Sequence, residues 1–319
     1  MMKMKLIVWV LILLSLVFTT SCNQPEEIKN MVLHAIEKQT EIKSYHFEGS
    51  AQIDIDHSLF TNKQTLAKEL MQLINKSTLT WSGFAQTQPN LIEMDLKITP
   101  MGSTTAMEIP VMMTSEHIYI QLPGINSIGE YTQINIPAEK DNQANSTDLE
   151  SSVSNSASHI IFALTSILYR EAPADWFKLS DMLATTDTEV VAQHITIEHQ
   201  DPTNRTFTDG FQTPLIPYRD LLAFTGLISD GSSNGTVNLR QLSWSTPSKM
   251  VIDIDPQGFI SQQTIDVSLA LPNEQAENKI IRLKYQQTYD QINQPPSFTK
   301  KIPKQILIWD DLLANINKP

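Results

Sequence analysis

The only cysteine of the chain, Cys22, is the residue whose surroundings most clearly predict a chemical reaction. A positively charged start, a largely apolar run over residues 6–18 and three hydroxyl residues lead directly into it. This order is typical of a secretory signal peptide. Cleavage between Ser21 and Cys22 would remove residues 1–21, and Cys22 would then present both a thiol and a free amine for acylation.

The apolar run is too short for a membrane-spanning helix, which needs about 20 apolar residues. Its ending resembles the lipobox of bacterial lipoproteins: Ser21 and Thr20 occupy the small-residue positions, and Thr19 stands where an aliphatic residue is usual. The resemblance implies that Cys22 carries a lipid anchor and that residues 22–27 form a tether. It also implies attachment to the extracytoplasmic side of the cell membrane. The alternative is a secreted protein with one spare thiol.

Other residue types that could support catalysis or bind a metal do not form a recognisable constellation. The closest histidines, His194 and His199, are an odd number of positions apart in a predicted strand, so we expect them on opposite faces at the sheet surface. Asp54 and Asp56 share the solvent face of another predicted strand. Motifs for a nucleophilic serine, a phosphate loop or a zinc-binding helix are missing. We therefore predict a non-enzymatic protein with no metal and no cofactor.

Charge and cysteine content narrow the possible partners. The net charge is −12 over 319 residues, which argues against nucleic acid and against tight contact with anionic lipid surfaces. Without a second cysteine the chain cannot form an intramolecular disulfide, so an apolar core must stabilise the fold. We expect contact with the membrane through the anchor at Cys22, and the sequence names no partner protein in the cell envelope.

The first half of the chain changes from helical to strand periodicity. Apolar residues at helical spacing over residues 28–42 predict an amphipathic helix, and strict alternation over residues 45–55 predicts a strand with one apolar face. Leu66, Leu70 and Leu73 mark a second helix, over residues 66–74. Further strands are predicted at residues 79–87, 91–99, 107–113, 117–122 and 131–136, the first two joined by a turn at Gln88-Pro89-Asn90.

The second half repeats this order after a polar segment. Residues 138–158 contain almost no aliphatic side chains and are interpreted as a flexible loop. Helices are predicted near residues 160–169 and 217–228, and strands at 190–199, 237–244, 250–255, 259–271 and 279–289. Asp255 to Gly258 is interpreted as a hairpin turn rather than a calcium loop. We therefore predict one domain over residues 28–319, built from two similar halves, 28–137 and 159–319.

The C-terminus carries a last apolar stripe at helical spacing. Its members, which follow Pro303, are Ile306, Trp309, Leu312, Leu313 and Ile316. We expect this helix to pack on the sheet or to cover it. A helix that binds a partner is the alternative.

The layout of the chain resembles that of a known group of proteins. The lipobox, the first helix, the strand entry Ser44-Tyr45-His46-Phe47-Glu48-Gly49 and the long closing strands before Lys300-Lys301-Ile302-Pro303 are similar to a family of Gram-positive lipoproteins. That family resembles in turn the LolA and LppX type of lipid and lipoprotein carriers. The resemblance implies an α+β fold: a strongly curved, mostly antiparallel sheet, forming an incomplete barrel, with helices packed on its concave side. It also implies an apolar cavity between sheet and helices, and no catalytic residues.

Aromatic, methionine and isoleucine residues of the predicted strands are the candidates for lining such a cavity. Methionine is flexible and polarizable, which suits a surface that must accommodate varied apolar shapes. Ordinary core packing is the alternative role for the same residues. The candidate lining residues are Tyr45, Phe47, Trp81, Phe84, Met94, Met112, Ile118 and Ile120.

These expectations favour a membrane-anchored lipoprotein that binds or carries an apolar or amphipathic ligand such as a lipid. The alternative is a structural or signalling adaptor that presents its sheet surface to another protein of the cell envelope. A continuous apolar cavity would favour the first function, and a solid core with an exposed apolar patch would favour the second.

Overall fold

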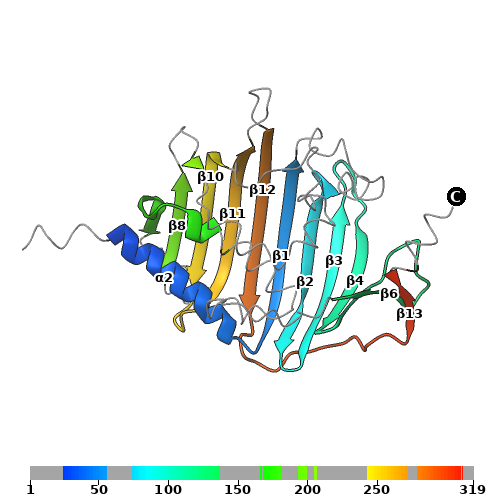
Figure 1. Cartoon of the computed structure of the whole chain (residues 1–319). Helices are drawn as coiled ribbons and strands as arrows, with labels where there is room; N and C mark the ends of the chain where they lie inside the picture. Colours follow the sequence, from blue (N-terminus) through cyan, green and yellow to red (C-terminus); the bar gives the residue numbers. More distant parts are fainter. Residues whose placement is uncertain are drawn as a thin grey trace, which may run out of the picture.

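The computed structural model describes residues 24–55, 74–136, 166, 168–180, 193–199, 205–206, 243–271, 279–309 and 311. The described chain is mostly strand, and its strands form one large, curved, open sheet (Figure 1). The helix α2 (Gln24–Lys38) lies across one end of this sheet (Figure 1).

The strands form two groups along the chain. The N-terminal group comprises β1 (Ser44–Ile55), β2 (Thr78–Thr87), β3 (Asn90–Thr99), β4 (Met107–Thr114), β5 (His117–Ile120) and β6 (Glu130–Asn135). The C-terminal group comprises β7 (Phe177–Ser180), β8 (Gln193–His199), β9 (Arg205–Thr206), β10 (Ser243–Ile254), β11 (Ile260–Leu271), β12 (Lys279–Asp290) and β13 (Gln305–Ile308). Two short 3-10 helices are η1 (Gln39–Glu41), which follows α2, and η3 (Ala174–Trp176), which precedes β7.

The two groups occupy opposite ends of the sheet. The order of strands is β13-β6-β5-β4-β3-β2-β1-β12-β11-β10-β8-β7, with β9 beside β10. The groups join where β1 pairs with β12, and β13 crosses to the far edge, where it pairs in parallel with β6. The other described neighbours are antiparallel, as predicted.

The register separates an apolar face from a polar face. At the junction of β1 and β12, Phe47 lies opposite Tyr289, whereas the next position places His46 opposite Asp290. Because successive side chains of a strand point to opposite faces, this parity continues through the neighbouring pairs. Apolar side chains therefore collect on one face from β8 to β5.

The helix predicted over residues 28–42 is found as α2, which covers the apolar face at one end of the sheet but begins at Gln24 and ends at Lys38. Residues 24–27, predicted to belong to a tether, are therefore helical. Glu26 and Glu27 in its first turn and Lys38 in its last turn complement the helix dipole. Its apolar stripe enters a core with residues of η3, β7, β8, β10 and β11. The buried residues of that stripe are Ile28, Val32, Ala35 and Ile36.

The structure supports a coarser fold than the one expected. Residues 168–171 are helical, and Leu168 and Tyr169 join the core under α2. The predicted helix at 217–228 and the loop 138–158 lie outside the described residues, and so does all but the last residue of the helix at 66–74. A layer of several helices on a concave side is therefore not established. The described fold is a large curved open sheet with a helix at one end.

Two strands that the sequence predicts separately belong to one strand of the structure, β10. The strands expected at 237–244 and 250–255 form the single strand β10 where they are described, and its register against β11 shifts between Ser245 and Lys249. A bulge interrupts the alternation of side chains without ending the strand. The sequence pattern therefore resembled a break between two strands.

The predicted hairpin turn after β10 is confirmed. Asp255 Oδ1 accepts the backbone N–H groups of Gln257 and Phe259, each at 2.8 Å. Gly258 has a φ of 86°, a conformation that glycine adopts at little cost. The β2–β3 hairpin is also confirmed, with Thr87 opposite Asn90.

The prediction of a C-terminal helix is wrong for residues 305–308, which form a strand, whereas Trp309 and Asp311 are helical. Ile306 lies in β13, opposite Tyr131 of β6. The edge strand β6 would otherwise present unpaired backbone N–H and C=O groups, and β13 satisfies them by pairing with it. In so short a segment this pairing outweighs the preference for a helix that the spacing of apolar residues indicates. Most of the predicted stripe lies outside the described residues. No described helix is long and apolar enough to cross a membrane.

Candidate functional site

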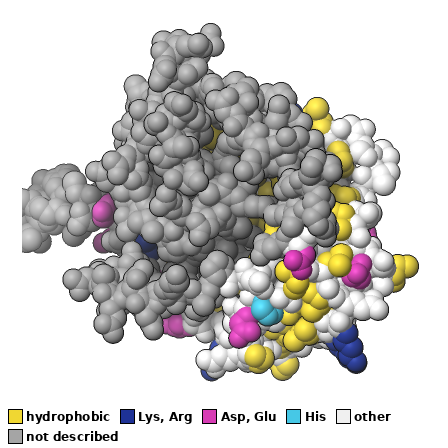
Figure 2. All heavy atoms as spheres, turned by 45° about the vertical axis from the view of Figure 1, so that its right-hand side comes forward, with side chains coloured by type: hydrophobic (Ala, Val, Ile, Leu, Met, Phe, Trp, Pro, Cys, Tyr) yellow, Lys and Arg dark blue, Asp and Glu magenta, His cyan; other side chains and the backbone are white. Residues whose placement is uncertain are grey.

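A stripe of half-buried apolar side chains crosses β2 to β5 on the apolar face, and we call it the half-buried end. The registers align it, because Trp81 lies opposite Leu96 and Met94 lies opposite Val111. Figure 2 brings the β4–β6 side of the sheet forward and shows hydrophobic side chains gathered on its surface. The partly exposed members of the stripe are Leu79, Trp81, Met94, Leu96, Met107, Ile118 and Ile120.

The opposite end of the same face is more deeply buried, and we call it the covered end: the apolar face of β8, β10 and β11 with α2. Ile252 of β10 and Ile265 and Val267 of β11 are each 0% exposed. Trp176 and Phe177 also pack into this core. An apolar surface that stays partly exposed in a folded protein often marks a binding site, which makes the half-buried end the candidate site.

The structure brings together six of the eight candidate lining residues. Tyr45, Phe47, Trp81, Met94, Ile118 and Ile120 lie on the apolar face, where the registers place them in contact. Phe84 and Met112 do not join them. Both pair with Glu93 across strands and so lie on the opposite face, where neither can line a cavity shared with the other six.

The C-terminal segment explains why apolar residues occur on that opposite face. The rings of Phe84 and Phe298 are in edge contact, with centroids 6.4 Å apart. The carboxylate of Glu93 accepts the backbone N–H groups of Thr299 and Lys300, each at 2.8 Å, and the Thr299 hydroxyl at 2.6 Å. We call residues 291–304 the C-terminal strap. It crosses the polar face and leads to β13.

A cluster of uncharged polar side chains interrupts the apolar face between its two ends, and we call it the polar seam. Gln263 Nε2 donates to Tyr289 Oη at 3.1 Å and to Tyr285 Oη at 3.4 Å, and Tyr169 Oη donates to Gln263 Oε1 at 3.3 Å. Gln287 Oε1 accepts from Tyr285 Oη at 3.4 Å. The members of the seam are Trp81, Tyr169, Gln263, Tyr285, Gln287 and Tyr289.

A glycine makes the closest contact in the seam possible. Trp81 Nε1 donates to Gln287 Oε1 at 2.7 Å, directly over Gly49. A Cβ at Gly49 would lie 2.8 Å from each of these two side chains and 2.5 Å from the Gln286 carbonyl oxygen. Gly49 therefore provides the space in which Trp81 and Gln287 meet.

Sequence reasoning missed the seam, although a signal was present. Gln263, Tyr285 and Gln287 occupy strand positions whose parity assigns them to the apolar face. A buried polar group needs a hydrogen-bond partner, so polar residues at such positions imply a network. The sequence did not show which residues meet, because β2 is far along the chain from β11 and β12.

Burial keeps the tyrosines of the seam neutral. The pKa of Tyr285 is raised well above its usual range, chiefly by burial. Burial likewise raises the pKa values of Tyr169 and Tyr289. The seam therefore offers hydroxyl and amide groups without charge near neutral pH.

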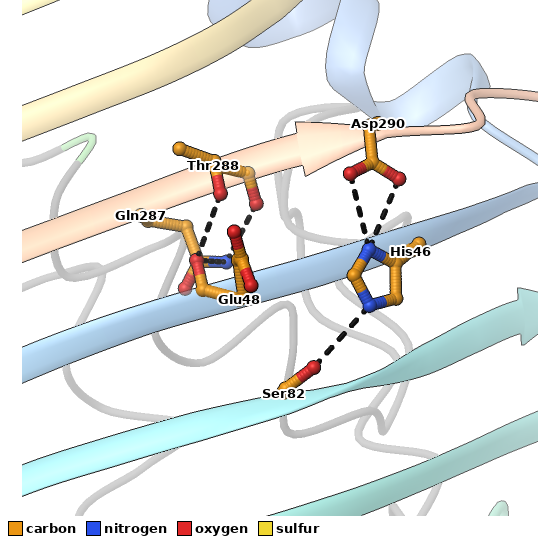
Figure 3. Close-up of polar contacts among 6 residues, drawn as sticks. All are labelled: His46, Glu48, Ser82, Gln287, Thr288 and Asp290. Atoms are coloured by element: carbon orange, nitrogen blue, oxygen red, sulfur yellow. Dashed lines mark hydrogen bonds and ion pairs between the residues drawn. The ribbon is translucent and has the colours of Figure 1, made fainter.

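A serine, a histidine and an aspartate meet on the polar face (Figure 3). His46 Nδ1 lies 3.0 Å from Asp290 Oδ1, and His46 Nε2 lies 3.3 Å from Ser82 Oγ. Hydrolysis by such a triad also needs donors for an oxyanion. The cross-strand partners of Ser82 are the carboxylates Glu48 and Asp95, which would repel an oxyanion, and ladder pairing uses the nearby backbone N–H groups. The arrangement is a polar link between three strands.

A shallow depression of about 490 Å³ lies on this same polar face. Ser82, Glu48, Asp95, Lys97 and Thr288 contribute to its lining. Lys97 Nζ is held by Glu108 Oε1 at 2.7 Å, which raises the Lys97 pKa. The depression is therefore polar and distinct from the apolar cavity that the resemblance implies.

The histidine prediction is half right. His194 and His199 lie on opposite faces as expected, but His199 is buried and stacks on Trp176 at 4.3 Å between centroids. The covered end encloses it, so it is not a surface residue. Asp54 lies on the polar face, 3.6 Å from Lys76 Nζ. Among the described residues, no group of three or more acidic, histidine or cysteine side chains is close enough to hold a metal ion.

The predicted cleavage and lipid-attachment positions, Ser21 and Cys22, lie outside the described residues, as does Asp56. The first described residue is Gln24, which begins α2. Any anchor at Cys22 would therefore be two residues from the helix that seals the covered end.

Comparisons with known proteins show only weak likeness. No protein-family model and no curated protein sequence matches the chain. Among solved structures, the chain is similar to LprF from Mycobacterium bovis at a TM-score of 0.37 and 9% identity, over 86% of this chain and 97% of that one. It is also similar to lipovitellin, in a structure that concerns lipid–protein interactions, at a TM-score of 0.24 and 12% identity. That match covers 82% of this chain and 26% of the lipovitellin chain. Both scores are too low to assign a fold family.

Proposed function

We propose that the protein is an extracytoplasmic lipoprotein, anchored at Cys22, that binds the hydrocarbon part of a lipid on the half-buried end of its apolar sheet face. The single observation that carries the binding proposal is the partial exposure of apolar side chains such as Leu96 and Ile120 on β2 to β5, on the same face where Ile252 of β10 and Ile265 and Val267 of β11 are 0% exposed. The Cys22 anchor rests on the sequence pattern alone.

The energetics of apolar burial support a lipid as the ligand. Each buried methylene contributes about 0.8 kcal/mol, so an acyl chain laid across several strands gains enough to offset the cost of association. Met94 and Met107 on the stripe suit chains of varied shape, because methionine adapts its conformation. Leu96 and Ile120 extend the same surface across neighbouring strands.

Dye binding tests the proposal directly. The full chain should bind a neutral phenylnaphthylamine dye with a rise in fluorescence, and lipid extracted from protein purified without detergent should be visible by mass spectrometry. Replacing Leu96 and Ile120 together by Gln should weaken dye binding by about thirtyfold, because each change removes apolar contact of roughly 1 kcal/mol.

A variant on the polar face provides the matched control. Thr80→Gln alters an exposed residue of β2 whose side chain points away from the stripe, and it should leave dye binding unchanged. Wild-type protein that neither binds the dye nor carries lipid would refute lipid binding and would favour the adaptor function.

The anchor requires a separate test. Cys22→Ser should abolish incorporation of a labelled fatty acid and release the protein from the membrane fraction or leave residues 1–21 uncleaved. Membrane retention of a correctly cleaved, unlabelled variant would refute the anchor. This result would not bear on lipid binding by the sheet.

A further inference from the structure

The polar seam assigns a chemical class to the ligand of the half-buried end, an inference that rests on the proposed lipid binding. We infer that the ligand is a lipid with an uncharged polar head, of the diacylglycerol type. Its acyl chains lie on the half-buried end, and its ester and hydroxyl groups hydrogen-bond with Tyr289 of the seam.

The position of the seam places it at the end of the proposed acyl-chain surface. Trp81 and Tyr289 pack against both the core under α2 and the cluster around Phe47 and Met113. Both are partly exposed, whereas Gln263 behind them is 0% exposed. A ligand on the half-buried end would therefore meet polar groups first at Tyr289 and Trp81.

The hydrogen bonds of the seam leave capacity for a ligand. The bonds of Tyr285 Oη to Gln263 Nε2 and to Gln287 Oε1 are each 3.4 Å long, at the weak limit for such contacts. Tyr289 Oη accepts from Gln263 Nε2 at 3.1 Å. A tyrosine hydroxyl has one donor and two acceptor sites, so Tyr289 can donate its own hydrogen to a ligand ester carbonyl or accept from a ligand hydroxyl.

The charged residues near the seam lie on the polar face, which argues for an uncharged head. In the described parts of β1, β3, β4, β10 and β11, and in β12 from Arg282 to Asp290, each charged residue has the parity of the polar face, as Glu48, Asp95 and Lys284 illustrate. Lys279, at the start of β12, pairs with Leu271, away from the seam residues Tyr285, Gln287 and Tyr289. A phosphate or carboxylate placed at the seam would lose its hydration without gaining a cation, which is costly. Hydroxyl and ester groups would gain hydrogen bonds at no such cost.

A matched pair of lipids tests the inference on the full chain. A fluorescent diacylglycerol and the phosphatidic acid with the same acyl chains differ only by the phosphate. We expect the diacylglycerol to bind at least about tenfold more tightly, because the anion would be desolvated without a partner. Equal or tighter binding of the phosphatidic acid would overturn the inference.

A second variant tests the seam itself. Tyr289→Phe removes one hydroxyl and should weaken diacylglycerol binding by about three- to tenfold, the worth of one hydrogen bond, with no change in binding of the phenylnaphthylamine dye. Tyr119→Phe on the polar-face side of β5 is the matched control and should change neither. Unchanged diacylglycerol binding by Tyr289→Phe would also overturn the inference.

The outcomes distinguish this inference from the function on which it rests. If wild-type protein binds neither the dye nor either lipid, the proposed function fails. If it binds the dye and both lipids alike, lipid binding stands and only the assignment of an uncharged head fails. The wild-type comparison of the two lipids decides the matter even if Tyr289→Phe folds poorly.

Discussion

The covered end and the half-buried end of the sheet are built from the same alternating pattern of apolar and polar residues. Ile265 and Val267 of β11 are 0% exposed, whereas Met94 and Leu96 of β3 keep part of their surface accessible. In both strands these residues occupy the same face. The difference therefore comes from what packs on the strand: α2, η3 and the segment 168–172 add a second layer over one end.

Strand periodicity therefore identifies an apolar face, but it does not indicate whether the protein covers that face or leaves it partly exposed. A face that the protein's own helix seals contributes to stability through burial and close packing. A face that stays partly exposed contributes less to stability and remains able to bind an apolar molecule.

The largest effect on the free energy of unfolding is expected from an acidic substitution at the covered end, compared with one at the half-buried end. Ile252→Asp at the covered end should cost more than about 4 kcal/mol of unfolding free energy, because it buries an unpaired charge among α2 and β11. Leu96→Asp at the half-buried end should cost roughly 1–2 kcal/mol, since its carboxylate can reach water. Urea unfolding of the two variants measures the contrast, and equal losses would break the comparison.

The next effect concerns the seam that separates the two ends. Gly49→Val should destabilise the protein by at least about 2 kcal/mol, because its side chain would displace Trp81 and Gln287. Ser50→Val, one position along on the polar face, should cost less than about 1 kcal/mol. Thermal unfolding followed by Trp fluorescence measures both variants. A tolerated Gly49→Val would show that the seam contact is dispensable.

Alkaline pH should weaken the seam and the covered end together. The pKa values of Tyr169, Tyr285 and Tyr289 are raised above the unfolded value of 10.0, so the folded protein binds more protons than the unfolded chain above pH 10. Their stabilisation is complete below pH 10 and falls above it by about 1.4 kcal/mol per pH unit for each tyrosine that stays protonated. Absorbance of tyrosinate should therefore rise together with the loss of native circular dichroism. Titration of all tyrosines in the native state would contradict this.

The smallest expected effect lies on the polar face. Glu93→Gln should lower the free energy of unfolding by about 1 kcal/mol. The new amide keeps one acceptor oxygen, but its NH₂ group cannot accept the N–H groups of the strap that the carboxylate accepts. Protease cleavage within residues 291–304 should accelerate, while dye binding at the half-buried end stays unchanged. Asp95→Asn, whose carboxylate is more exposed, should leave cleavage nearly unchanged. Faster cleavage combined with lost dye binding would show that the two faces are coupled.

Much of the fold could be predicted because its signals are local. The helical spacing of residues 28–36 and the alternation of 45–55 depend on neighbours along the chain, and α2 and β1 confirm both. The turn at Asp255 likewise needs only its own side chain and the following glycine. Such elements are determined by short-range geometry.

The candidate site was harder to predict because it depends on pairing between distant segments. Tyr45, Phe47 and Met94, predicted to line a cavity, lie on one apolar face, whereas Phe84, predicted to join them, contacts Phe298 of the strap on the opposite face. An apolar residue in a strand does not reveal which face another segment will cover. His199 shows the converse, since a polar residue type was expected at the surface and lies in the core.

The sequence by itself determined the alternation of strands, the first helix and a strong expectation for Cys22, because each of these depends on residues adjacent in the chain. Three features depend on the tertiary structure alone. The helix α2 covers one end of the apolar face, and Gln263, Gln287 and three tyrosines form a hydrogen-bonded seam. Phe84 contacts Phe298 of the strap instead of lining the apolar face. The physical reason is that burial and hydrogen-bond pairing are properties of contacts between segments, and strand register alone brings those segments together.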